Sequence, residues 1–147
     1  NLVLAKDERQ RQLGEKYRDT KGVQYTQAMA LAIAKLSGKS RRDMRDALVE
    51  RMVGMTEETL AGYLEDENSV IRRGAVLALA SRESTTYTDK VVDLLRDPEP
   101  TVVRAVHAAL CSLSAEDFGP SIGPTEEELD LAIGNWRNWW KKKSESP

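Results

Sequence analysis

The sequence has little of what most catalytic and metal sites are built from. Among 147 residues there is one cysteine, Cys111, and one histidine, His107. A disulfide within the chain is therefore excluded, and neither a zinc cluster of several thiolates nor a site of several histidines can be assembled. Glycine motifs that bind phosphates or present a nucleophilic serine are also missing. We therefore expect no catalytic residue, no cofactor, no metal ligand and no enzymatic activity.

Long hydrophobic runs are absent, and aromatic residues are scarce. No apolar stretch approaches the roughly twenty residues needed to span a bilayer, so no membrane span is expected. The aromatic residues number only three Trp, four Tyr and one Phe. Ala, Leu and Val dominate the apolar 40% of the chain, which favours close packing of helices. The net charge of −2 does not point to nucleic acid as the partner.

The sequence does contain a pattern that recurs every 31 residues. Residues 64–79 read LEDENSVIRRGAVLAL, and a shift of 31 gives LRDPEPTVVRAVHAAL at residues 95–110. The motif Arg-x4-Ala-Leu occurs three times at this spacing, beginning at Arg42, Arg73 and Arg104. Such a period is typical of stacked supersecondary units.

Each unit has the pattern of two helices joined by a tight turn. Thr56 is a good N-cap for the first helix of the middle unit, and Asp66 and Asn68 interrupt the apolar pattern as turn residues. The second helices are apolar on nearly all sides, so each should be covered by more than one neighbour. We predict helical hairpins at residues 23–54, 55–84 and 85–115.

These units resemble HEAT repeats, also called HEAT-like or PBS-type helical repeats, over about residues 23–113. The resemblance rests on Asp66-x4-Ile71-x-Arg73 and Asp97-x4-Val102-x-Arg104, each followed by Ala-Leu. It implies an all-α fold: a short right-handed α-solenoid of about three hairpins, with an N-terminal helix and a Trp-rich C-terminal capping helix. The end of the chain resembles the segment that closes HEAT arrays in bacterial, notably planctomycete, proteins.

The two ends of the array are expected to differ in structure. Residues 1–22 should form an N-terminal helix and a break, and residues 116–147 a loop and a capping helix, within one domain covering 1–147. Because the chain begins at Asn1 and not at Met, we expect a fragment of a longer protein, and localisation stays open.

The motif NWRNWWKKK at residues 135–143 fits the capping helix. Thr125 and Glu128 form a capping box that starts it. Its apolar stripe places Trp136 and Trp140 against the third hairpin, with Phe118 beneath them. Trp139 lies on the shoulder of the stripe and is the tryptophan expected to be free. The alternative is an exposed Trp/Lys patch that stacks on single-stranded nucleic acid or anchors a partner.

The candidate partner-binding residues lie on the second helices, which line the concave surface of HEAT arrays. They are Arg42, Arg45, Arg73, Arg104 and His107, together with Trp139 on the capping helix. Arg42, Arg73 and Arg104 should stack as a ladder because they are in register. Either each arginine pairs with a turn aspartate such as Asp66 or Asp97, or part of the ladder contacts an acidic partner segment.

The resemblance and the missing catalytic residues together indicate a non-enzymatic scaffold that binds a protein or peptide in its groove. Two alternatives remain open. One is a nucleic-acid-binding module with a basic groove, as in alkylpurine DNA glycosylases; the other is a purely structural spacer. An accessory role towards bilin chromophores, known for some HEAT-like proteins, has no residue here to mark it. We expect the domain to be monomeric.

Overall fold

The computed structural model describes residue 5 and residues 22–146. The predicted helix and break at residues 1–22 therefore lie almost wholly outside the described residues. Every regular element in the described part is helical: α2 (Val23–Ala34), α3 (Gly38–Val53), α4 (Glu57–Tyr63), α5 (Ser69–Ser81), α6 (Thr88–Asp93), the 3-10 helix η1 (Leu94–Arg96), α7 (Pro100–Ser114) and α8 (Glu126–Glu145). Among the described residues, no helix combines the length and the apolar character needed to cross a bilayer.

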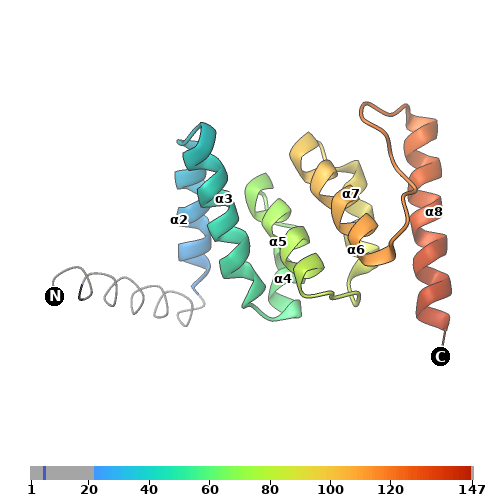
Figure 1. Cartoon of the computed structure of the whole chain (residues 1–147), viewed down its shortest axis with the longest axis horizontal. Coiled ribbons are helices and arrows are strands. Elements are labelled where there is room, and N and C mark those ends of the chain that lie inside the picture. Colours follow the sequence, from blue (N-terminus) through green and yellow to red (C-terminus); the bar gives the residue numbers. More distant parts are fainter. Residues whose placement is uncertain (1–4, 6–21, 147) are drawn as a thin grey trace.

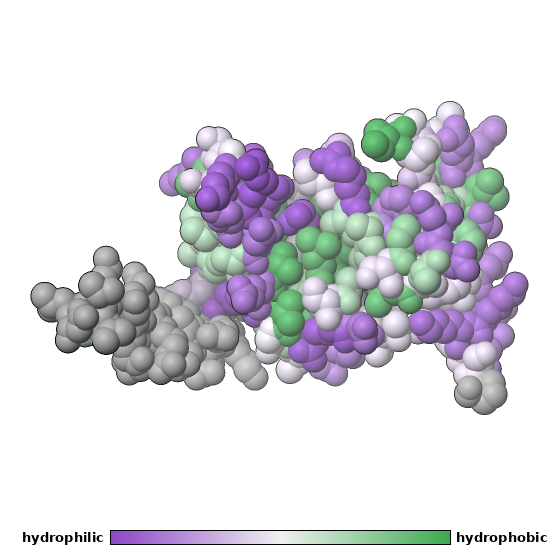
Figure 2. Space-filling model, in the orientation of Figure 1, coloured by the Kyte–Doolittle hydropathy of each residue, from purple (hydrophilic) through white to green (hydrophobic). Residues whose placement is uncertain are grey.

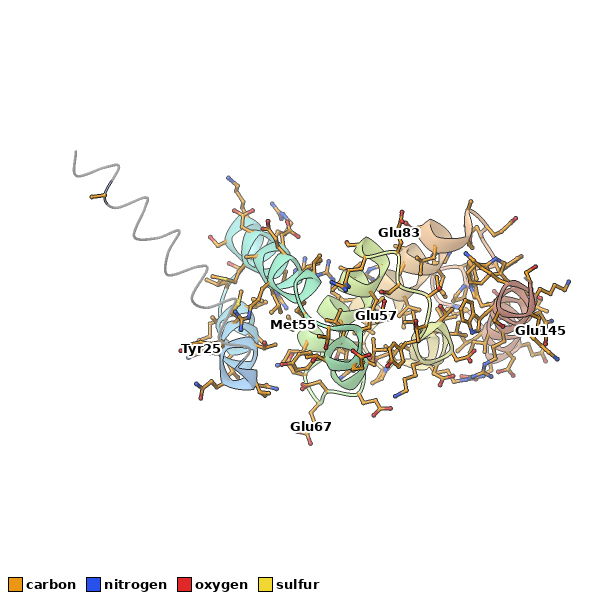
Figure 3. The ribbon with its side chains drawn as sticks, turned by 90° about the horizontal axis from the view of Figure 1, so that it is seen from below. Tyr25, Met55, Glu57, Glu67, Glu83 and Glu145 are labelled. Atoms are coloured by element: carbon orange, nitrogen blue, oxygen red, sulfur yellow. The ribbon has the colours of Figure 1, made fainter. Side chains whose placement is uncertain are left out.

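The helices form successive hairpins that stack side by side in two layers (Figures 1 and 3). The second helices α3, α5 and α7 make one layer, with α5 packed between the other two. The first helices α2 and α4, and the α6–η1 segment, make the other layer, each beside its hairpin partner. The predicted fold, a short all-α solenoid, is confirmed.

Capping residues set where the helices begin. The Thr56 hydroxyl oxygen accepts from the Thr59 backbone N–H at 3.2 Å, and the Asn68 side-chain oxygen accepts from the Val70 N–H at 2.9 Å. Pro100 occupies the first turn of α7, where its missing N–H has no intrahelical partner to lose. These are the turn and cap positions that the repeat pattern predicts.

The core lies between the two layers and is made largely of aliphatic side chains. On α5 four apolar residues at the spacing of one helix face are all buried: Ile71, Ala75, Ala78 and Leu79. Gly74 lets α5 approach α3 closely, because a Cβ built there would lie 2.7 Å from the Met52 sulfur. Small residues on the second helices thus allow the layer of α3, α5 and α7 to pack tightly.

Helix α8 stands at the end of the array and packs against α6 and η1 (Figure 1). Trp136 is fully buried, its indole N–H donates to the Gly119 carbonyl at 2.8 Å, and Phe118 meets it edge to face at 4.8 Å between ring centroids. The Thr125 hydroxyl oxygen accepts from the Glu128 N–H at 3.1 Å, which confirms this N-cap. The capping role predicted for Trp136 and Phe118 is thus seen directly.

The other two tryptophans depart from the prediction. Trp139 is half-buried, packs against the core and meets Trp136 edge to face, with the Lys143 ammonium over its ring at 5.2 Å. The expectation that Trp139 is the free tryptophan is therefore wrong. Trp140 is also half-buried, but it contacts Trp139 and not the core cluster. At the last turns of α8, Trp139 and not Trp140 therefore packs against the rest of the array.

Candidate functional site

A groove runs across the exposed face of α3, α5 and α7. Its apolar lining comes from Val49 and Val53 on α3, Leu77 and Ala80 on α5, and Ala108 and Ala109 on α7. Figure 2 shows this face, with apolar surface over the middle of the array and hydrophilic surface on either side. The side chains are small where the helices meet, which leaves room above them for a bound segment.

One end of the groove is lined by three arginines from three successive units. Arg45 of α3, Arg73 of α5 and Arg104 of α7 surround a depression that shares Leu77 and Ala108 with the apolar part. Within residues 22–146, none of these arginines forms an ion pair or a hydrogen bond. The Nε–H of Arg45 is buried without an acceptor. A buried donor without a partner is unfavourable and marks the place where an external acceptor would be stabilised.

The arginines also repel one another electrostatically. Burial lowers the pKa of Arg73 from its usual value, the charge of Arg45 lowers it next, and that of Arg104 lowers it further. The Asp46 carboxylate raises this pKa and so partly offsets the repulsion. The arginine remains protonated under any ordinary condition because its reference pKa is so high. A bound anion would relieve this repulsion.

Two carboxylates line the α3 side of the groove. Asp46 and Glu50, both on α3, border the apolar part beside Val49. The groove therefore carries a basic end, an apolar middle and an acidic flank. The positive charge of the groove is confined to the end formed by Arg45, Arg73 and Arg104.

The structure brings some of the candidate residues together and separates others. Arg45, Arg73 and Arg104 meet, whereas Arg42 is exposed on α3 and does not line the groove. Arg45 follows Arg42 by three residues and so lies about one turn further along the same side of α3. In the first unit, Arg45 and not Arg42 is therefore the arginine that lies with Arg73 and Arg104. His107 and Trp139 lie outside the groove lining.

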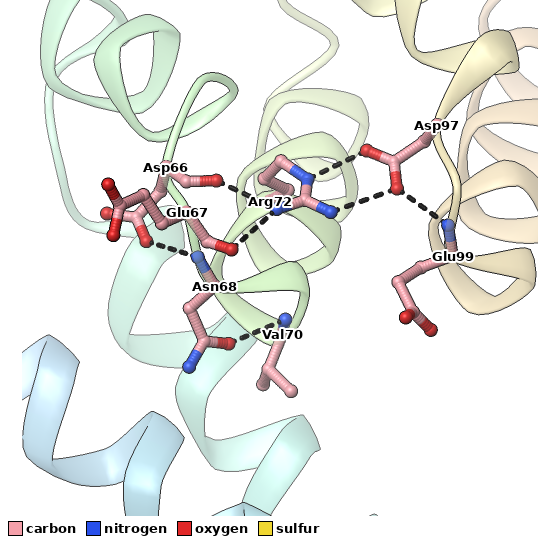
Figure 4. A network of polar contacts seen from close by, with 7 residues as sticks. All are labelled: Asp66, Glu67, Asn68, Val70, Arg72, Asp97 and Glu99. Carbon is pink, nitrogen blue, oxygen red and sulfur yellow. Dashed lines mark hydrogen bonds and ion pairs between the residues drawn. The ribbon is translucent and has the colours of Figure 1, made fainter.

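The arginine that pairs with a turn aspartate is Arg72 and not Arg73. Its Nε and Nη2 donate to the two carboxylate oxygens of Asp97 at 2.7 and 3.0 Å. Its Nη1 donates to the backbone carbonyls of Asp66 and Glu67 at 2.9 Å each (Figure 4). The expectation that Arg73 pairs with a turn aspartate is therefore wrong. Neighbouring residues on a helix point about 100° apart, so only one of two adjacent arginines can face the turn.

Asp66 occupies the equivalent turn of the preceding unit but has a different partner. Its carboxylate accepts from the Gln27 side-chain amide at 3.1 Å and from the Asn68 backbone N–H at 2.8 Å. Asp97 accepts from the Glu99 N–H at 2.9 Å in the same way. The hydrogen bond from the turn backbone to the aspartate therefore repeats between the units. The side chain that reaches the aspartate from another unit differs: Gln27 bonds to Asp66, whereas Arg72 bonds to Asp97.

A second group of polar residues lies on the C-terminal half of α7 and on the loop that follows it. The His107 Nε2 and an Asp117 carboxylate oxygen are 2.7 Å apart, and the Cys111 sulfur lies with them, so that all three atoms are within 4.8 Å of one another. His107 and Cys111 share a face of α7 because they are four residues apart. The chain turns at Ala115, whose φ is 60°, and brings Asp117 back beside the helix. Sequence reasoning missed this cluster because Asp117 belongs to the loop; only the His-x3-Cys spacing signals it.

The charges within this cluster affect one another. The hydrogen bond with His107, then the one from the Gly119 backbone N–H, holds the pKa of Asp117 below its usual range. Burial raises the pKa of the Cys111 thiol, and the Asp117 carboxylate raises it further. A nucleophilic cysteine needs a lowered pKa. The arrangement therefore does not support a Cys–His nucleophile, although all three groups are metal-binding types.

A family model described as HEAT repeats matches residues 19–111, which covers the three hairpins almost completely. No curated protein and no solved structure matches the chain significantly.

Proposed function

The chain belongs to the HEAT-repeat family, and from this premise we propose that it binds an acidic, partly apolar segment of a partner protein in the groove of α3, α5 and α7. HEAT repeats commonly act as non-enzymatic scaffolds for protein interactions. The observation that carries the proposal is the set of Arg45, Arg73 and Arg104. These side chains come from three successive units and find no carboxylate partner within the described part of the chain.

The groove offers an acidic segment two kinds of contact. Asp or Glu side chains would pair with the arginines, and guanidinium groups can hold a carboxylate through two parallel hydrogen bonds. Leu or Val side chains would lie on the surface formed by Leu77, Ala108 and Val53. The apolar contacts would supply most of the affinity, while the charges would set the association rate and the choice of partner.

Nucleic acid fits this groove less well. A phosphate backbone that crossed all three units would run beside Asp46 and Glu50, which repel it. The net charge of −2 adds no long-range attraction. A purely structural spacer, the other alternative, gives no reason for arginines of three successive units to meet at one depression.

The test is selection of peptide ligands against the folded domain. A phage-displayed library of random peptides is panned on the wild type and, in parallel, on the variant Arg45→Gln/Arg73→Gln/Arg104→Gln. Glutamine keeps much of the aliphatic stem and removes the charge. We expect the wild type to enrich peptides that combine acidic and apolar residues, and the variant to bind them about tenfold more weakly.

A matched control removes the same number of charges outside the groove. Lys39, Arg41 and Arg42 are exposed on the first turns of α3, and their replacement by glutamine changes the net charge by the same amount. This control should retain peptide affinity within about twofold. Enriched peptides without acidic bias, or equal weakening in both variants, would exclude the arginine end as the site. Binding of an oligothymidylate with steep salt dependence would favour the nucleic-acid alternative.

A further inference from the structure

The cluster of His107, Cys111 and Asp117 is separate from the groove and has no part in the proposed function. The three donor atoms lie within 4.8 Å of one another. Two of them come from adjacent turns of α7, and the third comes from the loop that leaves it. The question is whether these residues only fasten the loop or also form a site.

We propose that His107, Cys111 and Asp117 bind a divalent transition-metal ion of the zinc class, with water in the fourth position. Imidazole, thiolate and carboxylate are the donor types that Zn²⁺ takes in proteins, at about 2.0–2.3 Å. Tetrahedral ligands at those distances are roughly 3.3–3.8 Å from one another. The observed cluster is close to that size, and the His107–Asp117 contact of 2.7 Å would open slightly to admit the ion.

The surroundings hold the donors in place. Asp117 is fixed by the Gly119 backbone N–H, which donates to its carboxylate at 2.9 Å. Gly119 is fixed in turn because its carbonyl accepts from Trp136. The Ser114 hydroxyl oxygen accepts from the Glu116 backbone N–H at 2.9 Å and so shapes the turn before Asp117. Supporting hydrogen bonds of this kind typically orient metal ligands.

The charges of the occupied site balance. The thiolate of Cys111 and the carboxylate of Asp117 together carry two negative charges, which neutralise a divalent cation. Binding would break the Cys111 S–H bond, form the metal–sulfur bond and release the thiol proton to water. The proton between His107 Nε2 and Asp117 would also leave Nε2, and the neutral imidazole would carry it on Nδ1 instead. The carboxylate of an aspartate is already ionised at neutral pH. No oxidant or reductant takes part.

The test is titration of the chelator-treated, reduced protein with Co²⁺, a coloured stand-in for Zn²⁺. One equivalent should produce a sulfur-to-cobalt charge-transfer band in the near ultraviolet and intense visible bands typical of tetrahedral cobalt. An equivalent of Zn²⁺ should displace both. Cys111→Ser should remove the charge-transfer band, while His107→Gln and Asp117→Asn should each weaken cobalt binding at least about tenfold.

The control variant is Glu116→Gln, which removes the acidic side chain next to Asp117 in the sequence but outside the cluster. It should bind Co²⁺ like the wild type. Circular dichroism of every variant establishes that the helices remain folded. Absence of a charge-transfer band at stoichiometric Co²⁺, or a band that survives Cys111→Ser, would overturn the proposal. So would unchanged binding in both His107→Gln and Asp117→Asn, and the three residues would then serve only to fasten the loop.

Discussion

Arg72 and Asp97 fix the junction between the second and third units at the scale of single residues. Their side chains are only 13% and 3% exposed, and the guanidinium also reaches two carbonyls of the preceding turn. The hydrogen bonds with Asp97, and then the negative charges around the guanidinium, raise the pKa of Arg72. Removal of either partner from such a pair should lower the stability of the fold, because the remaining charge would stay buried without its hydrogen bonds.

The first prediction concerns this pair. Arg72→Met should lower the free energy of unfolding by about 2–4 kcal/mol, because the Asp97 carboxylate would stay buried without its partner. Denaturant unfolding followed by circular dichroism measures the loss. The neighbouring substitution Arg73→Met is the matched control, and it should be neutral or slightly stabilising because it removes repulsion from Arg45. Equal losses in the two variants would contradict the assignment.

The sequence could not tell these two arginines apart. Both lie in the repeated segment, and the register with Arg42 and Arg104 favoured Arg73. The choice depends on how far α5 is rotated about its axis, which packing against α3 and α7 sets. A 31-residue period therefore predicts which helices stack but not which side chain crosses the turn.

At the scale of elements, glycine has opposite roles in two helices. Gly74 in α5 faces α3, where an added methyl group would meet the buried Met52 sulfur at 2.7 Å. Gly134 in α8 is exposed, and nothing lies within 4 Å of the same added atom. Both positions carry the low helix propensity of glycine, so they differ only in packing.

The second prediction compares alanine at these two positions. Gly134→Ala should stabilise the protein by up to about 1 kcal/mol through helix propensity alone. Gly74→Ala should gain the same propensity but lose about 1–3 kcal/mol to overpacking, so the net change should be destabilising. Thermal unfolding of both variants tests this. Adding Met52→Val to Gly74→Ala should restore part of the lost stability. If Gly74→Ala were instead as stable as Gly134→Ala, α3 and α5 would be less closely packed than the structure shows.

The elements themselves were the most predictable part of the structure. The repeat, the caps at Thr56 and Thr125 and the apolar stripe of α5 follow from spacing and local chemistry, so the helices could be placed from the sequence. The groove was only partly predictable, because Arg45 and not Arg42 completes its basic end. The tight cluster around His107 depends on a loop that returns to α7, and no helical period describes that path.

At the scale of the whole molecule, each unit contacts mainly its neighbours, so stability should vary along the array. Helix α8 depends on α6 and η1, while α3 depends on α2 and α5. Damage at one end should therefore spread to adjacent helices before it reaches the far end. This behaviour distinguishes a solenoid from a closed bundle, in which every helix borders a common core.

The third prediction uses hydrogen exchange to separate these cases. Trp136→Ala should destabilise the α8 junction by about 3–5 kcal/mol, because a fully buried ring and its hydrogen bond to Gly119 are lost. Backbone amides of α8, α6 and η1 should then exchange much faster, while those of α3 and α5 change little. Leu48→Ala, at a buried position of α3, should give the reverse distribution. If each variant instead accelerates exchange equally in every helix, the array unfolds as one cooperative unit, and a ligand in the groove would stabilise both ends equally.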